Sequence, residues 1–449
     1  MSSTDHQEVG PAKARIEPDA MFGHGSGPPR RTGPLAKRDM RLAYLMLLPT
    51  FAIVVGIVLG PLLANFWIAF KPVTLADLRP PTPLANEQLR PRPKAAGDEV
   101  VLRYRVRNSS QKEALGAVRM RDVLPAGLVP LSLDPRCALD GRALDCDFGT
   151  IEAKGRFNLE IPVRVEQAYL TAGERPRATK PVFTADAPNV LTSLTFTLDN
   201  FRRLFASPDF WDVMWVSMVY TVGGTAGALV LGLFAAQILN TAFAGRNVLR
   251  GLFLFPYVAP VIAVAFAWVL LLDAGPGGTL NALLMRMGAT DGPINFLGQR
   301  YVPFDVFGAT FRFPLALATV IVFESWRYFP LAFLFILARM QSVSSEMYEA
   351  AEMDGATPLQ QFWRISLPQL AGILAVLFLL RFIWTFNKFD DIFLLTGGAA
   401  GTRTLTVDVY EQAFAVSNLG AGAAVAVVVF FVLVAFALIF FRLSPKDEA

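Results

Sequence analysis

Six long apolar windows constrain the fold of this chain more than any other feature of its sequence. A helix needs about 20 predominantly apolar residues to cross the hydrocarbon core of a bilayer. Of the 449 residues, 53% are hydrophobic and only 17% are charged, a balance that is typical of a membrane protein. We therefore expect an all-α polytopic membrane protein with six transmembrane helices. The windows are roughly 42–70, 211–239, 251–272, 313–338, 369–395 and 420–441.

The polar tail before the first window predicts the orientation of the chain. Residues 1–41 are rich in Gly and Pro, so we expect them to be disordered. Basic side chains beside a first span favour a cytoplasmic N-terminus, and six spans then return the C-terminal tail, residues 443–449, to the cytoplasm. The first window is too long for the apolar region of a signal peptide and lacks a clear cleavage site, so we expect it to be retained. The basic residues of the tail are Lys13, Arg15, Arg30, Arg31, Lys37, Arg38 and Arg41.

Residues 71–195, between the first two windows, have the pattern of β-strands rather than of membrane helices. Apolar residues between Phe157 and Val165 alternate with polar residues and one proline, and Leu102 and Tyr104 alternate with arginines. A period of two is typical of strands with one buried face, and turn signals separate the strands at intervals typical of a sandwich. The predicted orientation places this β-domain outside the cytoplasmic membrane.

The only two cysteines, Cys137 and Cys146, flank a turn in this segment. On the oxidising side of a membrane such a pair favours a hairpin disulfide, and two free thiols are the alternative. Two cysteines without histidine supply too few ligands for a metal, so we expect none. The segment 100–166, with its Asp-Val-Leu-Pro-Ala-Gly-Leu run at 122–128, resembles the Ig-like conserved-repeat domains of bacterial surface proteins. This resemblance implies an Ig-like β-sandwich.

The segment 346–368, between the fourth and fifth windows, is the most specific motif of the chain. Its sequence predicts a short polar helix, a turn at a glycine where a Cβ would obstruct the backbone, and a second helix that ends at a proline. This spacing, in a loop that the topology places in the cytoplasm, resembles the EAA loop of bacterial ABC-importer permeases. The resemblance implies a coupling helix that fits a cleft on a partner ATPase; an ordinary amphipathic connector is the alternative. The coupling residues are Glu349, Ala350, Ala351, Asp354, Gly355, Ile365, Leu367 and Pro368.

Weaker motifs in residues 196–442 extend this resemblance. A Phe-Thr-Leu-Asp-Asn-Phe run at 196–201 is similar to the elbow that leads into the next span in sugar permeases, and a Leu-Leu-Thr-Gly-Gly run follows at 394–398. In this order, with the coupling loop and the first window, the motifs resemble the maltose-type branch of carbohydrate importers. The resemblance implies the type I importer permease fold. The maltose permease also carries a large periplasmic domain in the loop equivalent to 71–195.

Residues that enzymes commonly use are scarce. The only two histidines, His6 and His24, lie in the polar tail, which excludes a histidine-based triad or a histidine-rich metal centre inside the membrane. No G-x-x-x-x-G-K-[ST] sequence occurs, so this chain does not hydrolyse ATP with that loop. We expect no catalytic residue and no cofactor; a partner protein or an ion gradient must supply the energy.

Charged residues inside the fourth and fifth windows are candidates for a substrate pathway, because ionisable groups in a membrane usually line a pathway or pair with each other. The alternative is a structural ion pair of Glu324 with Arg381 or with Arg327. Similarity to the maltose-type pattern implies that the substrate-facing positions are Glu324, Arg327, Tyr328, Leu331, Arg381, Trp384, Thr385 and Lys388. The three cations suit an anionic sugar or a glycerol-phosphate-like solute, but Glu324 would repel an anion, so we favour a neutral sugar.

The sequence therefore predicts the permease subunit of an ATP-driven ABC importer of a sugar or oligosaccharide, in the bacterial inner membrane, with an inserted extracytoplasmic β-sandwich. One alternative is an ion-coupled secondary transporter with Glu324, Asp390 and Asp391 as ion ligands, which leaves the coupling loop unexplained. A membrane-anchored adhesion or scaffold protein leaves five spans unexplained. The expected partners are a sister permease, two ATPase subunits, a periplasmic or lipid-anchored solute-binding protein and the lipid bilayer, but no nucleic acid.

Overall fold

The computed structural model describes residues 34–110, 113–172, 180–187, 189–306 and 309–443, and the chain forms two compact units, residues 1–63 and 64–449. Helix α1 (Pro34–Ile53), the π-turn η2 (Val54–Leu59) and α2 (Gly60–Ala69) follow one another. Because α1 begins at Pro34, residues 34–41 are helical and do not belong to a disordered tail. Proline is favourable at a first helical position, where the N–H that it lacks would have no partner. The tail residues 1–33 and 444–449 lie outside the described residues.

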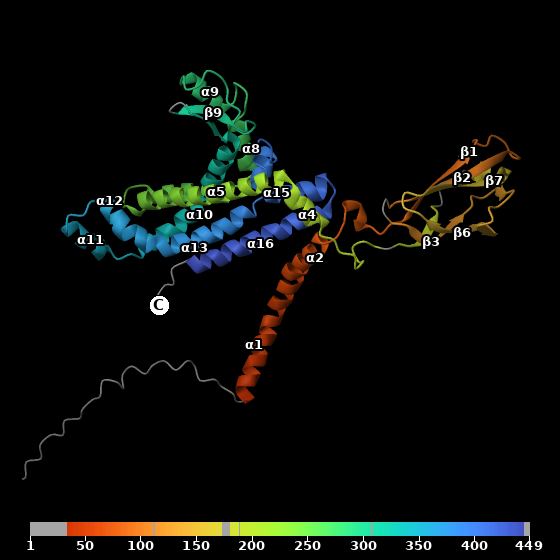
Figure 1. The fold of residues 1–449 in the computed structure, drawn as a ribbon, viewed down its shortest axis with the longest axis horizontal. Coiled ribbons are helices and arrows are strands. Elements are labelled where there is room, and N and C mark those ends of the chain that lie inside the picture. Colours follow the sequence, from red (N-terminus) through yellow and green to blue (C-terminus); the bar gives the residue numbers. More distant parts are fainter. Residues whose placement is uncertain (1–33, 111–112, 173–179, 188, 307–308, 444–449) are drawn as a thin grey trace, which may run out of the picture. The chain divides into compact units, whose positions relative to one another are not determined.

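Two four-stranded antiparallel sheets form the β-domain (Figure 1). Leu102, Met120 and Leu159 contribute to one hydrophobic core that both sheets share, so the domain is a β-sandwich. Strand β2 is hydrogen-bonded to β7 in the same sheet. On the outer face of this sheet, Arg103 forms an ion pair with Glu160 at 2.8 Å, as the alternation predicts. The first sheet has the order β1 (Pro83–Arg90), β2 (Glu99–Asn108), β7 (Arg156–Val165) and β4 (Leu128–Pro130), and the second has the order β5 (Cys137–Asp140), β6 (Ala143–Ile151), β3 (Leu115–Val123) and β8 (Val182–Asp186).

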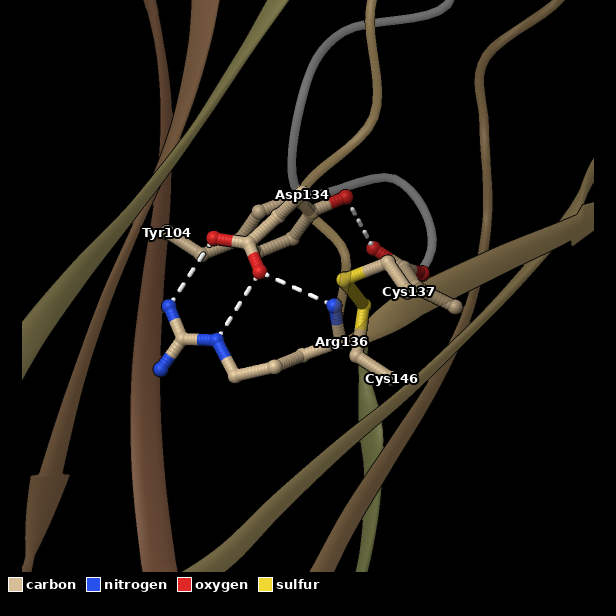
Figure 2. Close-up of a disulfide and its surroundings, with 6 residues drawn as sticks. Tyr104, Asp134, Arg136, Cys137 and Cys146 are labelled. Carbon is tan, nitrogen blue, oxygen red and sulfur yellow. Dashed lines mark hydrogen bonds and ion pairs between the residues drawn. A yellow bond between two sulfur atoms is a disulfide. The ribbon is translucent and has the colours of Figure 1, made fainter.

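A disulfide joins Cys137 and Cys146, which lie opposite each other on β5 and β6. Beside it, Arg136 donates two hydrogen bonds of 2.9 Å to the carboxylate of Asp134 (Figure 2). These bonds favour the ionised carboxylate and lower the pKa of Asp134 to about 2. The disulfide and this ion pair therefore hold the same hairpin.

Four long helices lie side by side in the second unit (Figure 1). Ala235, Ala332 and Leu377 belong to one buried cluster that joins α5, α10 and α13, and Val425 belongs to another that joins α16 to α5 and α13. Small residues at such contacts let helix backbones approach closely. These helices are α5 (Pro208–Asn240), α10 (Leu315–Gln341), α13 (Leu367–Phe386) and α16 (Leu419–Leu443).

The third predicted window is bent rather than straight. The helical segments 246–258 and 261–271 meet at an angle of 93°. Pro260 explains the break, because the residue before a proline avoids the helical region, and Ala259 has an extended ψ of 142°. The described residues therefore contain five helices that are long and apolar enough to cross a membrane, or six if the bent pair is one span.

The fifth window also differs from the prediction. The helix there extends over Pro358–Phe386, so Pro368 does not end the second helix of the coupling segment. Pro368 follows a short π-helix, η4 (Phe362–Ser366), in which the regular α-helical hydrogen-bond pattern is already interrupted. The lack of a backbone N–H at proline therefore removes little further hydrogen bonding, and the helix continues. The helix ends at Phe386, and residues 387–389 separate it from a short helix, α14 (Asp390–Thr396).

The shorter elements connect these helices or lie beside them. A two-stranded antiparallel hairpin, β9 and β10, precedes α10. The bounds of the remaining elements are η3 (Leu75–Leu78), α3 (Gln167–Ala172), α4 (Asp199–Ala206), α6 (Arg246–Phe253), α7 (Phe255–Val258), α8 (Val261–Leu271), α9 (Thr279–Arg286), β9 (Val302–Val306), β10 (Ala309–Phe313), α11 (Ser345–Met353), α12 (Pro358–Gln361), α15 (Leu405–Tyr410) and η5 (Glu411–Ala415).

Lys71, just after α2, is completely buried. Its ammonium donates hydrogen bonds to three backbone carbonyls of segment 190–195, those of Val190, Ser193 and Thr195. It also lies 4.6 Å from the ring centre of Trp67. All three N–H groups of the ammonium thus have a carbonyl acceptor, and the charge also lies over an aromatic ring. Lys71 therefore joins the end of α2 to the segment that precedes α4.

Candidate functional site

Glu324, near the middle of α10, is the centre of a buried ion-pair cluster. Arg381 on α13 donates to its Oε1 at 2.5 Å, and Thr385 donates to the same atom at 3.0 Å. The hydroxyl of Tyr220 on α5 donates to Oε2 at 3.0 Å. A Cβ on Gly224 of α5 would lie 2.6 Å from Cγ of Glu324, so this glycine makes room for the carboxylate side chain. Three helices therefore meet at one fully hydrogen-bonded carboxylate.

Tyr328, one helical turn further along α10, lies among three cations. Lys388 and Arg327 donate hydrogen bonds to its hydroxyl, the latter over 3.2 Å. The guanidinium of Arg381 lies 4.2 Å from its ring centre, within the range of a cation–π interaction. Arg327 also donates to the carbonyl of Ala259 at 3.5 Å, the residue at the bend of the third window.

Asp391 on α14 is completely buried beside these cations. Its carboxylate lies 3.8 Å from Nε of Arg327 and 3.8 Å from Nζ of Lys388. Neither of its oxygens accepts a hydrogen bond from any described residue. Lys388 also lies 3.9 Å from the half-exposed carboxylate of Asp390. The cluster therefore contains three cations and three carboxylates, and its formal charges balance.

The predicted substrate-facing residues fall into an enclosed group and an accessible group. Glu324, Arg381 and Thr385 are at most 1% exposed in this chain, whereas Trp384 is 46% exposed. Lys388 is partly exposed, and Leu331 is half-buried. The ion pair between Glu324 and Arg381 is the structural alternative that the sequence left open, and Arg327 pairs with Asp391 instead of Glu324. The substrate-facing roles remain predictions.

Tyr220 and Asp391 belong to the cluster but are not among the predicted substrate-facing positions. Tyr220 lies in another window, and no local pattern connects it to Glu324, which is 104 residues away. The sequence indicated Asp391 only as an ion ligand, although it follows Lys388, which lies in the link before α14, by only three residues. Among the described residues, no group of three His, Cys, Asp or Glu side chains could hold a metal ion.

The coupling segment forms a helix–turn–helix at one end of the bundle (Figure 1). Ser344 caps α11 by accepting a hydrogen bond from the backbone N–H of Glu346. Gly355 has a φ of +76°, a left-handed conformation that favours glycine. Hydroxyls of Tyr348 and Ser366 lie 2.9 Å apart and join the two arms. The segment therefore has a defined shape of its own.

Most of the predicted coupling residues lie on the surface of this segment. Glu349, Ala350, Asp354, Gly355 and Pro368 are exposed, and the other three, Ala351, Ile365 and Leu367, are half-buried. Large apolar side chains are exposed beside them, with Met353 at 89%, Leu359 at 67% and Trp363 at 60%. Exposed apolar side chains grouped in this way are typical of surfaces that contact another protein or a membrane.

Several long apolar helices that pack around a buried ion-pair cluster are typical of a multi-pass membrane protein. Residues 228–446 match the family model described as "Binding-protein-dependent transport system inner membrane component". The chain is 36% identical over 248 residues to the inner membrane ABC transporter permease protein YcjO of Escherichia coli, covering 55% of this chain and 79% of that protein. The chain therefore belongs to the permease family of binding-protein-dependent ABC importers and is an inner-membrane protein.

The names of two further relatives state which solute their transport systems carry. The trehalose/maltose transport system permease protein MalF of Thermococcus litoralis is 31% identical, covering 55% of this chain and 79% of that protein. The sulfoquinovosyl glycerol transport system permease protein SmoG of Agrobacterium fabrum is also 31% identical, with coverage of 52% and 71%. Sugar ABC permeases are thus among the relatives of this chain. The family match begins at residue 228 and does not include the β-domain.

Proposed function

We propose that this chain is one of two permease subunits in an ATP-driven importer of a neutral sugar or oligosaccharide. The trehalose/maltose relative supports the sugar class. The main support for a neutral substrate is that the charges of the cluster balance. The ion pairs are Arg381 with Glu324, Arg327 with Asp391, and Lys388 with Asp390 and Asp391. A cluster whose cations are already paired offers little net attraction to an anion.

An anionic solute is the second candidate, because Lys388 is partly exposed and one relative transports sulfoquinovosyl glycerol by name. Uptake by two variants separates the candidates. For a neutral sugar, Lys388→Gln mainly changes affinity, by about 1–3 kcal/mol for a lost charged hydrogen bond. Glu324→Gln leaves Arg381 buried without its counter-charge, so its uptake is measured per folded complex and should not rise. Loss of all uptake in Lys388→Gln, together with improved uptake in Glu324→Gln, would instead assign an anion. Because the chain belongs to a family of ABC permeases, the alternative of ion-coupled secondary transport has no support.

Transport energy enters through the coupling segment, residues 346–368. Its exposed small and apolar residues and its fixed turn support docking on an ATPase subunit. A solute-binding protein delivers the substrate from outside, and closure of two ATPase subunits moves the segment and switches the cavity between outward-facing and inward-facing states. One chain supplies half of the pathway, so a sister permease completes it. The proposal includes six spans with both termini in the cytoplasm, an orientation in which the segment lies on the ATPase side.

The turn at Gly355 provides the test of coupling. A Cβ and a charge at its left-handed backbone misplace the segment, so Gly355→Asp should abolish sugar-stimulated ATP hydrolysis while the chain stays in the membrane. Glu349→Lys should weaken association with the ATPase. Gly288→Asp is the matched control, because Gly288 also has a positive φ, +67°, and a Cβ there would meet nothing within 4 Å, as at Gly355. Normal hydrolysis by the Gly355→Asp complex would refute the coupling role.

We also propose that the β-domain lies outside the membrane and docks the binding protein or steadies the assembly. The disulfide supports an oxidising location. Thiol labelling of intact cells, with and without reductant, tests the location and the bridge together. Labelling of Cys137 and Cys146 only from the cytoplasmic side would reverse the proposed orientation.

A further inference from the structure

Asp391 differs from the other buried carboxylate of the cluster in how its oxygens are used. Both oxygens of Glu324 accept hydrogen bonds, three in all, from Arg381, Thr385 and Tyr220. Both oxygens of Asp391 are buried and accept none from the N–H and O–H groups of the described residues, although the carboxylate of Glu324 lies nearby. Buried polar groups are nearly always hydrogen-bonded, so Glu324 has the surroundings of a structural residue, whereas Asp391 has capacity for a further donor.

The donors around Asp391 are also incompletely used. Nη1 of Arg327 is buried and has no hydrogen-bond partner among the described residues. The ion pairs of Asp391 with Arg327 and with Lys388 are both 3.8 Å long, beyond hydrogen-bond length. At such a separation one oxygen atom can bridge the two charged groups through two shorter bonds. The missing partner is therefore a group that both donates and accepts.

We propose that Asp391 is a substrate-contacting residue that, with Arg327 and Lys388, binds one hydroxyl of the transported sugar. The hydroxyl donates its hydrogen to Asp391 and accepts a hydrogen bond from Arg327 or Lys388. A carboxylate or phosphate group of a substrate has no such hydrogen to donate at neutral pH, so the site selects neutral hydroxyls. This inference rests on the proposed sugar substrate and names the residue that sets its specificity.

Two of the predicted substrate-facing residues, the partly exposed Lys388 and the exposed Trp384, are accessible to solvent beside this site. Lys388 is 19% exposed, and its Nζ lies 3.8 Å from the completely buried carboxylate of Asp391. Trp384 is half-exposed on the same helix as Arg381, and aromatic faces commonly pack against sugar rings in such pockets. Lys388 has a flexible side chain, so its movement admits the hydroxyl while Asp391 remains fixed on α14.

Transport assays on the complete complex in liposomes, with its binding protein, test the contact. The probes are maltose, trehalose and their singly deoxygenated analogues. Asp391→Asn should raise the KM by about 10- to 100-fold and leave kcat within a few-fold. It should also abolish the preference of the wild type for the parent sugar over one deoxy analogue, and Asp391→Glu should restore part of that preference.

Asp408→Asn is the matched control, since Asp408 on α15 is also buried, at 5% exposure, and lies outside the cluster. It should keep the wild-type preference among the sugars. A uniform loss of uptake for every sugar in Asp391→Asn would show a structural role and overturn the proposal. If the wild-type complex transports neither sugar nor analogue, the proposed substrate class fails, and the next measurement decides the role of Asp391.

Thiol reactivity tests the location of Asp391 independently of substrate identity. The chain has two cysteines, which are joined to each other, so labelling is read on this chain after its separation from the partner subunits. Asp391→Cys should react with aminoethyl methanethiosulfonate while the complex hydrolyses ATP. Ser217→Cys, at an equally buried position on α5 with 2% exposure, should not react. Asp391→Cys that stays as unreactive as Ser217→Cys throughout turnover would overturn the proposal.

Discussion

In the β-domain, arginine–carboxylate pairs such as Arg121–Asp145 and Arg164–Glu99 lie on exposed strand faces, and more than 45% of each of these side chains is exposed. In the helical bundle, Arg381 and Glu324 pair where each side chain is at most 2% exposed. The β-domain obtains its stability from an apolar core between its sheets. The bundle, in contrast, places charge at the contact of three helices.

This difference shows how the surroundings determine what an ion pair contributes. An exposed pair typically contributes about 0–1 kcal/mol, because water solvates its partners equally well when they separate. A buried pair is strongly destabilised when one partner is removed, because the other charge is left without compensation. The exposed pairs of the β-domain can therefore be lost singly, whereas the buried pair of the bundle must be kept or replaced as a unit.

The largest effect is expected for Arg381→Met. This substitution leaves Glu324 buried without its cation and should destabilise the bundle by about 3–5 kcal/mol. Thermal unfolding of the purified chain in detergent, with the amount recovered from membranes, measures the loss. The double variant Glu324→Gln/Arg381→Met should recover much of that stability. If the double variant is as unstable as the single one, the ion pair is not the cause.

Removal of the Lys71 ammonium should have the next largest effect on stability. Lys71→Met leaves three carbonyls without their donor and should cost about 3 kcal/mol, measured by hydrogen exchange at residues 68–71 and 190–196. Because Lys71 is saturated and distant in sequence from the cluster, the KM for sugar should not change. The exposed Lys94 provides the control substitution Lys94→Met. A changed KM in Lys71→Met would contradict a purely structural role.

A smaller effect is expected when the disulfide is removed. The bridge spans a sequence separation of 9, so Cys137→Ser/Cys146→Ser should cost the β-domain roughly 2–3 kcal/mol by the loop-entropy estimate. Hydrogen exchange of β5 and β6 in the complete chain should accelerate, while the helices of the bundle keep their protection. Equal loss of protection in α10 and α13 would show that the two regions do not respond separately.

The smallest effect is expected for Asp134→Asn, because this ion pair is partly exposed. Arg136 lowers the folded pKa of Asp134 to about 2, below its usual value of about 3.9. The carboxylate therefore stabilises the hairpin fully above the usual pKa, and this contribution disappears as the pH falls through 2. Exchange rates of β5 in wild type and Asp134→Asn should differ at pH 6 and converge near pH 2. A constant difference would contradict the assignment.

Local patterns in the sequence were sufficient to predict several elements. The alternation around Tyr104 and Ile161 predicted buried strand faces, and both side chains are completely buried. The effects of two prolines on their helices were harder to predict. Pro260 bends its helix by 93°, whereas Pro368 does not end its helix, since a π-turn precedes it. A proline restricts its own neighbourhood, but the surrounding hydrogen bonds decide between a bend and continuation.

By itself, the sequence determined the family, the apolar helices and the β-domain, because these depend on composition, period and short motifs that neighbouring residues carry. The charged residues of the fourth and fifth windows were visible in the same way. Only the tertiary structure decided their partners, since Tyr220, Glu324 and Asp391 come from three helices far apart in the chain. Which carboxylate is saturated and which has free capacity depends on distances of a few tenths of an ångström, and those are set by helix packing.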